Sequence, residues 1–184
     1  VVVGLGLLFG NGAASYISRL LGQEKEEQAN KVASTSLYCS LTIGIILILF
    51  CVVFLKPILI LLGATKSILP YAMTYAGIYI ISCIFNVFNV TMNNIVTSEG
   101  AAKTTMLALL TGAILNIALD PLFIYTFDFG VAGAAIATGL SQCVGGLFPL
   151  VYFLRPNTSR LRLVKTRLEL RPMLNACGNG SSEL

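Results

Sequence analysis

Long apolar stretches alternate with short polar connections along this chain. No charged residue occurs between positions 32 and 55, a stretch longer than the roughly 20 residues with which a helix crosses the hydrocarbon core of a bilayer. Similar stretches cover about residues 71–95, 104–127 and 129–154, and the chain begins within another one, residues 1–17. The pattern predicts about five transmembrane segments, of which the first is partial.

The connections between these stretches are short, which favours helices that pack beside their sequence neighbours. An open sheet would leave backbone groups unpaired in lipid, and the alternating pattern of an outer-membrane barrel is absent. We therefore expect an all-α fold, a polytopic transmembrane helix bundle. Residues 1–154 would form its helices, residues 155–172 a basic linker, and residues 173–184 the start of a further transmembrane helix.

Composition strengthens the membrane interpretation and limits the chemistry. Hydrophobic residues make up 56% of the 184 positions and charged residues 11%, with a mean hydropathy of +0.85, whereas about a quarter of the residues in a soluble domain are charged. Histidine is absent, which excludes histidine-based triads and zinc sites from this stretch of sequence. The five cysteines show no metal-ligand spacing, so we interpret them as buried thiols.

The basic residues are distributed unevenly between the two sides of the alternating helices. Lys56 and Lys66 fall on one side, and all other lysines and arginines fall on the opposite side. Cytoplasmic connections carry the excess of Lys and Arg, so we expect this second side to be cytoplasmic in a multi-pass protein of the plasma membrane. Its residues are Arg19, Lys25, Lys31, Lys103, Arg155, Arg160, Arg162, Lys165, Arg167 and Arg171.

The basic segment 155–171 has two interpretations. It could bind anionic lipid or nucleic acid, or it could be a linker that fixes the topology near the lipids of the inner leaflet. Aromatic residues for base stacking are absent from it, so the linker is favoured and nucleic acid is not an expected partner. Residues 161–171 could form an amphipathic helix at the membrane surface.

Asp120 places a carboxylate deep in an apolar stretch. At a helical rise of about 1.5 Å per residue it lies roughly 24 Å from the cytoplasmic start of its segment. A charged group at this depth usually faces a bundle interior or a wet cavity and marks an ion or substrate pathway. In the alternative interpretation, Asp120 caps a new helix that begins with Pro121, and the preceding helix ends early.

Amide side chains accompany this carboxylate. Asn116 lies four residues before Asp120 on the same helix face and could donate a hydrogen bond to it. Asn86, Asn89 and Asn93 form a polar stripe along the preceding apolar stretch. This stripe could line a cavity or form hydrogen bonds between helices.

Two further features predict packing rather than chemistry. Gly133, Ala137 and Ser141 are spaced four residues apart on one helix face, which lets neighbouring helices approach closely. Glu99 and Lys103 are expected to pair with each other or to be solvated at the cytoplasmic surface.

Several stretches, in order along the chain, resemble the multidrug and toxic compound extrusion (MATE) transporters. The matching pieces are GNGAASYISRLLGQ, LLGATKSILPYAMTYAGIYI, SEGAAK, NIALDPLFIY and FGVAGAAIATGLSQ. The resemblance covers essentially the whole chain. It implies a fragment that corresponds to the second to sixth helices of a twelve-helix, two-lobe protein. Such a fragment would need the missing first helix, with its acidic residue, and the carboxy-terminal lobe.

The resemblance also implies a function and a set of residues. MATE transporters export small organic, often cationic compounds in exchange for protons or Na+, without an organic cofactor. Their coupling residues correspond in type and spacing to Asn116, Asp120 and Thr138, and a further Asn corresponds to Asn93 or, as second choice, Asn89. Na+, if it is the coupling ion, would bind at Asp120. Side chains that could line a substrate cavity, or equally face lipid or core, are Phe85, Phe88, Met92 and Phe123.

Three alternatives stay open. A lipid-linked oligosaccharide flippase of the same superfamily would favour basic residues in its cavity, and the predicted segments contain none. A non-transporting scaffold subunit would pair Asp120 with a Lys or Arg of its partner. A membrane-embedded enzyme would use more than one deep carboxylate, so we predict that the protein is not an enzyme.

Overall fold

The computed structural model describes residues 2–155, 159 and 161–162. Within them, all regular secondary structure is helical. The elements are α1 Val2–Gly22, α2 Glu26–Val53, α3 Leu55–Leu61, α4 Leu69–Ser98, α5 Ala102–Pro121, the π-helix η1 Leu122–Thr126 and α6 Gly130–Leu154. The predicted further helix at 173–184, and all but the first two residues of the predicted amphipathic helix 161–171, lie outside the described residues.

Four helical segments are long and apolar enough to cross a membrane. They are Glu26–Val53, Leu69–Ser98, Ala102–Thr126 and Gly130–Phe153. Each coincides closely with a predicted segment, and the remaining predicted segment lies within α1. The predicted all-α transmembrane bundle is thus confirmed.

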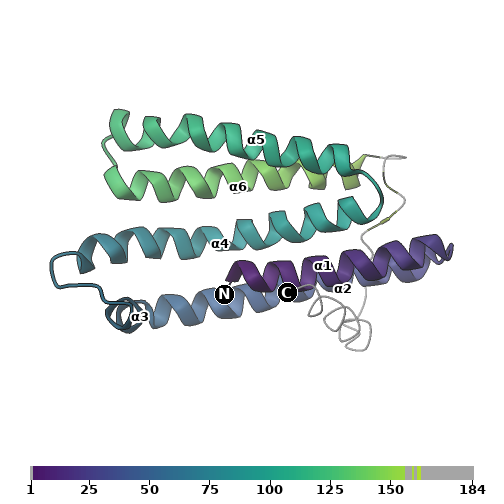
Figure 1. The fold of residues 1–184 in the computed structure, drawn as a ribbon, viewed down its shortest axis with the longest axis horizontal. Helices are drawn as coiled ribbons and strands as arrows, with labels where there is room; N and C mark the ends of the chain where they lie inside the picture. The colour runs from purple at the N-terminus through teal and green to yellow at the C-terminus, as the bar shows by residue number, and fades with distance from the viewer. Residues whose placement is uncertain (1, 156–158, 160, 163–184) are drawn as a thin grey trace.

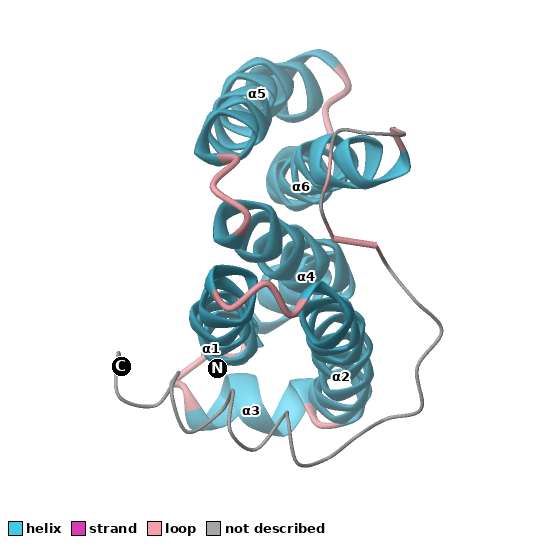
Figure 2. Ribbon diagram, turned by 90° about the vertical axis from the view of Figure 1, so that its right-hand side faces the viewer, coloured by secondary structure: helices cyan, strands magenta, loops and turns pink. Residues whose placement is uncertain are grey.

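The long helices pack side by side with nearly parallel axes, and α4 lies at the centre (Figure 1). Viewed along these axes, α1 and α2 lie on one side of α4, while α6 lies on the other side with α5 beyond it (Figure 2). Among the described residues, α6 contacts α4 and α5 but neither α1 nor α2. The bundle is therefore layered, and α4 joins its two outer layers.

The connections alternate between the two ends of the bundle. The α1–α2 connection, the α4–α5 connection and the C-terminal end of α6 share one end of the bundle, which we call the basic end (Figure 1). The opposite end carries α3, with Lys56 in it and Lys66 shortly after it. The described members of the predicted one-sided set lie at or near the basic end: Arg19, Lys25, Lys31, Lys103, Arg155 and Arg162.

A short helix, α3, occupies part of what the sequence predicted as a connection, and Pro57 explains its position. Proline has no N–H, and its ring clashes with the carbonyl four residues earlier, that of Val53, where α2 ends. In the first turn of α3 the same proline is tolerated. Gly63 then takes a φ of +93°, the left-handed conformation that commonly follows a helix end.

The chain does not start a new helix at Asp120. α5 continues through Pro121, whose φ of −63° and ψ of −33° are helical, and η1 follows directly. No side chain caps η1, so the interpretation of Asp120 as a helix cap is wrong. Because Pro121 lacks an N–H, the carbonyl of Ile117 loses its helical donor. Beyond Pro121, Leu122 N donates to the Leu119 carbonyl, and in the wider turn of η1 Phe127 N donates to the Leu122 carbonyl.

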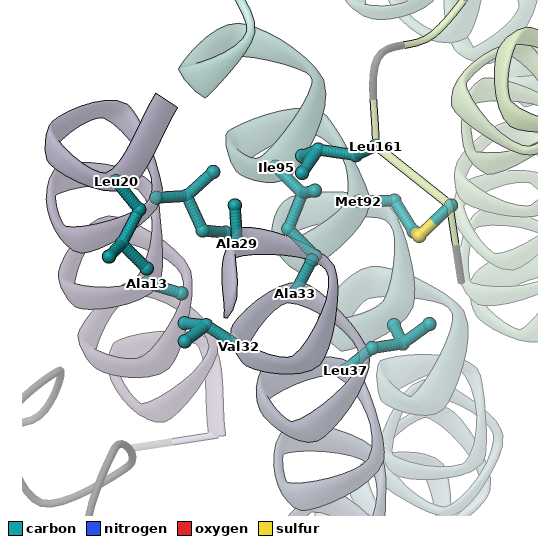
Figure 3. Close-up of a cluster of buried hydrophobic side chains, with 10 residues drawn as sticks. Ala13, Leu20, Ala29, Val32, Ala33, Leu37, Met92, Ile95 and Leu161 are labelled. Carbon is teal, nitrogen blue, oxygen red and sulfur yellow. The ribbon is translucent and has the colours of Figure 1, made fainter. Parts of the chain in front are cut away.

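The main hydrophobic core lies between α1, α2 and α4 (Figure 3). Small side chains such as Ala13, Ala29 and Ala33 are fully buried there, which lets the helices approach closely. On α6, the predicted stripe of Gly133, Ala137 and Ser141 is buried, so the predicted close packing is confirmed. In α5, by contrast, Ala108 is the one buried residue.

Candidate functional site

A chain of amide side chains crosses from α4 to α6 inside the bundle. Asn93 Nδ2 donates to Asn89 Oδ1, and Asn89 Nδ2 donates to Gln142 Oε1 at 2.7 Å. Asn89 and Asn93 are only 6% and 5% exposed. Buried amides are stable in an apolar environment only when they are hydrogen-bonded. Gly145 leaves the necessary room, because a Cβ there would lie 3.1 Å from Asn89 Nδ2.

A cavity of about 180 Å³ lies between α4, α5 and α6, directly beside this chain. Each of the three helices contributes one predicted site residue to its wall: Asn89, Asn116 and Thr138. The other lining residues are Ala108, Leu109, Gly112, Ala113, Ser141 and Gln142. The cavity has a polar wall where α4 and α6 meet, and it is large enough for a few water molecules or an ion.

Asp120 lies on the same face of α5 as Asn116, one turn further from the basic end. Asn116 Nδ2 donates to Asp120 Oδ1 at 3.4 Å, which is long for a hydrogen bond. Both side chains are partly buried. Asp120 is not among the lining residues of the cavity. Its carboxylate is connected to the cavity wall through the hydrogen bond from Asn116, which does line it.

The site combines oxygen acceptors with amide donors. The Thr138 hydroxyl donates to the Ala134 carbonyl at 2.9 Å, so the lone pairs of its oxygen remain available. Asn93 Oδ1 is buried and has no hydrogen-bond partner within the described part of the chain. Carboxylate, amide and hydroxyl oxygens are the ligands that hard cations prefer. A group of three or more His, Cys, Asp or Glu that could hold a metal is not found in the described residues.

The structure does not gather the predicted substrate-cavity residues. Met92 is fully buried in the core between α1, α2 and α4, and Phe88 packs against the same core. Phe85 is 42% exposed on α4. Phe123 stacks on Phe129 at the end opposite to the basic end, with ring centroids 6.2 Å apart. None of the four predicted side chains lines the cavity between α4, α5 and α6.

Two residues of the cavity wall, Ser141 and Gln142, were not predicted as site residues. A signal for them exists, because they follow Thr138 by three and four residues and therefore share its helix face. The sequence does not show that this face of α6 turns toward Asn89. That juxtaposition depends on how α4 and α6 pack.

Glu99 differs from its prediction. It neither pairs with Lys103 nor is free in solvent, because Tyr152, Ser159 and the backbone of Leu161 donate hydrogen bonds to it. An exposed ion pair contributes little free energy, so these three donors prevail over the lysine. Among the described residues the one ion pair joins Lys31 Nζ to Glu27 Oε1, at 3.0 Å.

Comparison with known proteins finds relatives of this chain. The MatE family model matches residues 1–122. The multidrug export protein MepA of Staphylococcus saprophyticus subsp. saprophyticus is 38% identical over 155 residues, which are 84% of this chain. The match covers 34% of that protein, so the chain spans well under half the length of this curated relative.

Two solved structures show a similar fold. They are described as the inward-facing and the outward-facing conformation of a multidrug resistance MATE family transporter of the MOP superfamily. Their TM-scores are 0.90 and 0.89, and each is 32% identical in sequence. The similarity covers 100% and 99% of this chain, and 43% and 42% of the solved chains.

Proposed function

This chain belongs to the MatE family of multi-pass membrane proteins, and we propose on that premise that it is part of a cation-coupled antiporter. The antiporter would export small organic compounds, often cationic, by alternating access. The observation that carries the proposal is the Asn116–Asp120 pair beside a polar cavity within the membrane-spanning helices. The proposed coupling ion, H+ or Na+, binds at Asp120 with support from Asn116, Thr138, Asn93 and Asn89.

A carboxylate between membrane-spanning helices can couple two gradients because its charge is costly there. A proton or Na+ neutralises that charge. Binding then shifts the balance between outward-open and inward-open states, provided that the ion binds the two states with different affinity. An organic cation competes with the coupling ion for the same negative charge, and the exchange of one for the other is antiport.

The size of the cavity supports an ion rather than the exported compound as its occupant. At about 180 Å³ it is smaller than the roughly 300–1,000 Å³ of sites that hold drug-sized ligands. We propose that the organic compound binds in a larger space, between this bundle and the part of the protein that the longer relatives contain.

The two matched conformations support a rigid-body mechanism. This chain resembles the inward-facing and the outward-facing structure equally well, with TM-scores of 0.90 and 0.89. Domain rotation about an interface is a common form of transport-related change. We infer that the bundle moves as one body between the two states, and that the large rearrangement lies between this body and the remainder of the transporter.

The flippase alternative receives less support, because no basic side chain lines the cavity. The scaffold alternative would pair Asp120 with a basic residue of another protein; within this chain Asp120 accepts a hydrogen bond from Asn116. For the location we propose the plasma membrane, with the basic end in the cytoplasm, on the excess of Lys and Arg there.

Substitution of Asp120 tests the proposed function. The complete protein would be reconstituted in liposomes, and efflux of a fluorescent organic cation would be followed under an imposed pH or Na+ gradient. Asp120→Asn removes the titratable charge and retains the shape. We expect gradient-driven efflux to fall by about tenfold or more, in line with typical coupling energies between sites.

Asp128→Asn is the matched control. Asp128 is exposed in the η1–α6 connection with a φ of +54°, a conformation that Asn also tolerates. Its substitution should leave transport unchanged. Normal gradient dependence in Asp120→Asn would refute the assignment of Asp120, and absence of efflux from the wild-type protein under either gradient would favour the flippase or scaffold alternative.

A further inference from the structure

The carboxylate of Glu99 holds the chain that follows α6. Glu99 is the C-cap residue of α4, at the basic end. Its Oε1 accepts hydrogen bonds from Ser159 Oγ at 2.6 Å and from the backbone N–H of Leu161 at 2.7 Å. Its Oε2 accepts one from Tyr152 Oη, on α6, at 3.0 Å. Hydrogen bonds to an ionised carboxylate are about twice as strong as neutral ones.

Leu161 adds an apolar contact to this polar anchor. Its side chain is 1% exposed and belongs to the core between α1, α2 and α4. Figure 3 shows Leu161 next to Ile95 of α4, close to Met92. A leucine buried to this extent loses a large apolar area to the core and does not leave it at low cost.

A third contact reaches α2. The backbone N–H of Arg162 donates to Asn30 Oδ1 at 2.7 Å, while the Arg162 side chain stays exposed. Within four residues, the chain therefore bonds to the end of α4, enters the core and bonds to the start of α2. Side chains from the end of α4 and from α2 bond to this segment, and the core between α1, α2 and α4 buries Leu161, which distinguishes the segment from a free tether.

The route of the segment matters because of the layered fold. Helix α6 touches α4 and α5 but neither α1 nor α2 among the described residues. Ser159, Leu161 and Arg162 come after α6 in the chain, yet they contact the end of α4, the core between α1, α2 and α4, and the start of α2.

We propose that Glu99 anchors a brace, formed by Ser159, Leu161 and Arg162, that ties the basic end of α6 to α1 and α2 across α4. The brace holds the two outer layers at a fixed distance and makes the bundle one body at this end. Glu99 is a positioning residue in this arrangement. This role does not depend on transport of any compound.

Hydrogen exchange tests the anchor in the complete protein embedded in lipid nanodiscs. The amides of Leu161 and Arg162 should exchange slowly in the wild-type protein, because both are bonded to side-chain oxygens. Glu99→Ala should accelerate the Leu161 amide by about tenfold or more, the loss expected for a bond to a charged acceptor. The Arg162 amide should also exchange faster, because Leu161 would no longer hold Arg162 in position to bond to Asn30.

Graded variants separate the anchor from general damage. Tyr152→Phe removes the donor to Oε2 and leaves both bonds to Oε1, so it should have little effect on the Leu161 amide. In Glu99→Gln the exchange rate of the Leu161 amide should lie between those of wild type and Glu99→Ala. The glutamine keeps one acceptor oxygen, but its NH₂ group cannot accept a hydrogen bond. The control is Glu27→Gln, an exposed glutamate at the same end whose bonding partner is Lys31.

A distance measurement tests the brace itself. Spin labels would be placed at the exposed positions Gln23, after α1, and Arg155, after α6, in a variant whose five native cysteines are replaced. Glu99→Ala should broaden the distribution of distances between the two labels, while Glu27→Gln should not.

Two outcomes would overturn the proposal. Unchanged exchange at Leu161 and Arg162 in Glu99→Ala would show that Glu99 does not anchor the segment. Faster exchange at Leu161 and Arg162 in Glu99→Ala, with an unchanged distribution of distances between the two labels, would show that Glu99 holds the segment but that the segment does not hold the ends of α1 and α6 together. Faster exchange throughout α4, including the end far from Glu99, would mean that the fold itself is lost, and Glu99→Gln would then decide by the same two readouts.

Discussion

At the scale of single residues, the orientation of Asn89 determines the character of the cavity wall. Its NH₂ donates to Gln142 and its carbonyl accepts from Asn93, so both ends of one amide are engaged. The carbonyl oxygen of Gln142 accepts the bond from Asn89, so the NH₂ group of Gln142 remains as a donor. The α4–α6 wall therefore offers an amide donor, whereas the Asp120 carboxylate, which lies outside the cavity lining, can only accept hydrogen bonds while it is ionised.

Replacement of Gln142 by leucine should destabilise the protein. The Asn89 NH₂ would stay buried without its acceptor, at a cost of about 1–3 kcal/mol. Thermal unfolding of the purified complete protein in detergent would measure the effect. Gln28→Leu, at an exposed position in α2, should stay within about 0.5 kcal/mol of wild type. Equal unfolding temperatures for both variants would show that another acceptor replaces Gln142 as the partner of the Asn89 NH₂.

Local spacing made some of these residue contacts predictable and left others hidden. The Asn116–Asp120 pair follows from a separation of four positions on one helix, which the sequence shows directly. The Asn89–Gln142 bond joins residues 53 positions apart, and the Glu99–Leu161 bond joins residues 62 apart. Such pairs depend on helix packing, so residue spacing alone could not give Glu99 its partners.

At the scale of helices, the periodic apolar stretches predicted the spans well because each must cover the same hydrocarbon thickness. The points at which one helix ends and the next begins were harder to predict. Two prolines at the edges of helices behave in opposite ways: Pro57 separates α2 from α3, whereas Pro121 lies within a continuous helical path. At Pro121 the helical path continues directly into the π-helix η1, and the sequence alone does not distinguish the two cases.

The contact between α6 and η1 should be sensitive to a single methyl group. A Cβ on Gly133 would lie 2.7 Å from the carbonyl oxygen of Phe123, which is backbone and cannot rotate away. Gly133→Ala should therefore destabilise the protein by about 1–3 kcal/mol through overpacking. The thermal unfolding temperature of the complete protein would reveal it.

Gly112→Ala provides the opposite expectation on the neighbouring helix. Its Cβ would lie 3.5 Å from the Ser141 carbonyl oxygen, an ordinary contact. Alanine is favoured over glycine inside a helix by about 1 kcal/mol, so this variant should be neutral or more stable. If Gly133→Ala were as stable as Gly112→Ala, the close approach of α6 to η1 would not be obligatory.

At the scale of the whole molecule, the bundle exposes apolar side chains that a water-soluble protein would bury. Leu109, Leu110, Ile114 and Ile117 of α5 are all largely exposed. In a membrane such a face meets lipid or another helix without penalty, and van der Waals packing rather than water exclusion holds helices together. This explains why α5 has a place in the fold with almost no buried residues of its own.

The two ends of the molecule should face opposite sides of the membrane. We expect cysteines introduced at the exposed positions Gln23 and Ala102 to react with a membrane-impermeant maleimide only in inside-out vesicles. A cysteine at the exposed Thr65 should react only in intact cells. Cys177 would be replaced by serine beforehand, and the parent protein without added cysteines is the control. Labelling of all three positions from the same side would refute the alternating topology.

The burial of Leu161 determines where the polypeptide can be divided into two co-expressed pieces. A cut directly after α6 would leave the core of α1, α2 and α4 without one of its own side chains, and Glu99 without two of its three donors. A cut beyond Arg162 would keep the contacts of Ser159, Leu161 and Arg162 in the first piece. The last described helix of the bundle ends at Leu154, yet contacts that hold the bundle together extend at least as far as Arg162.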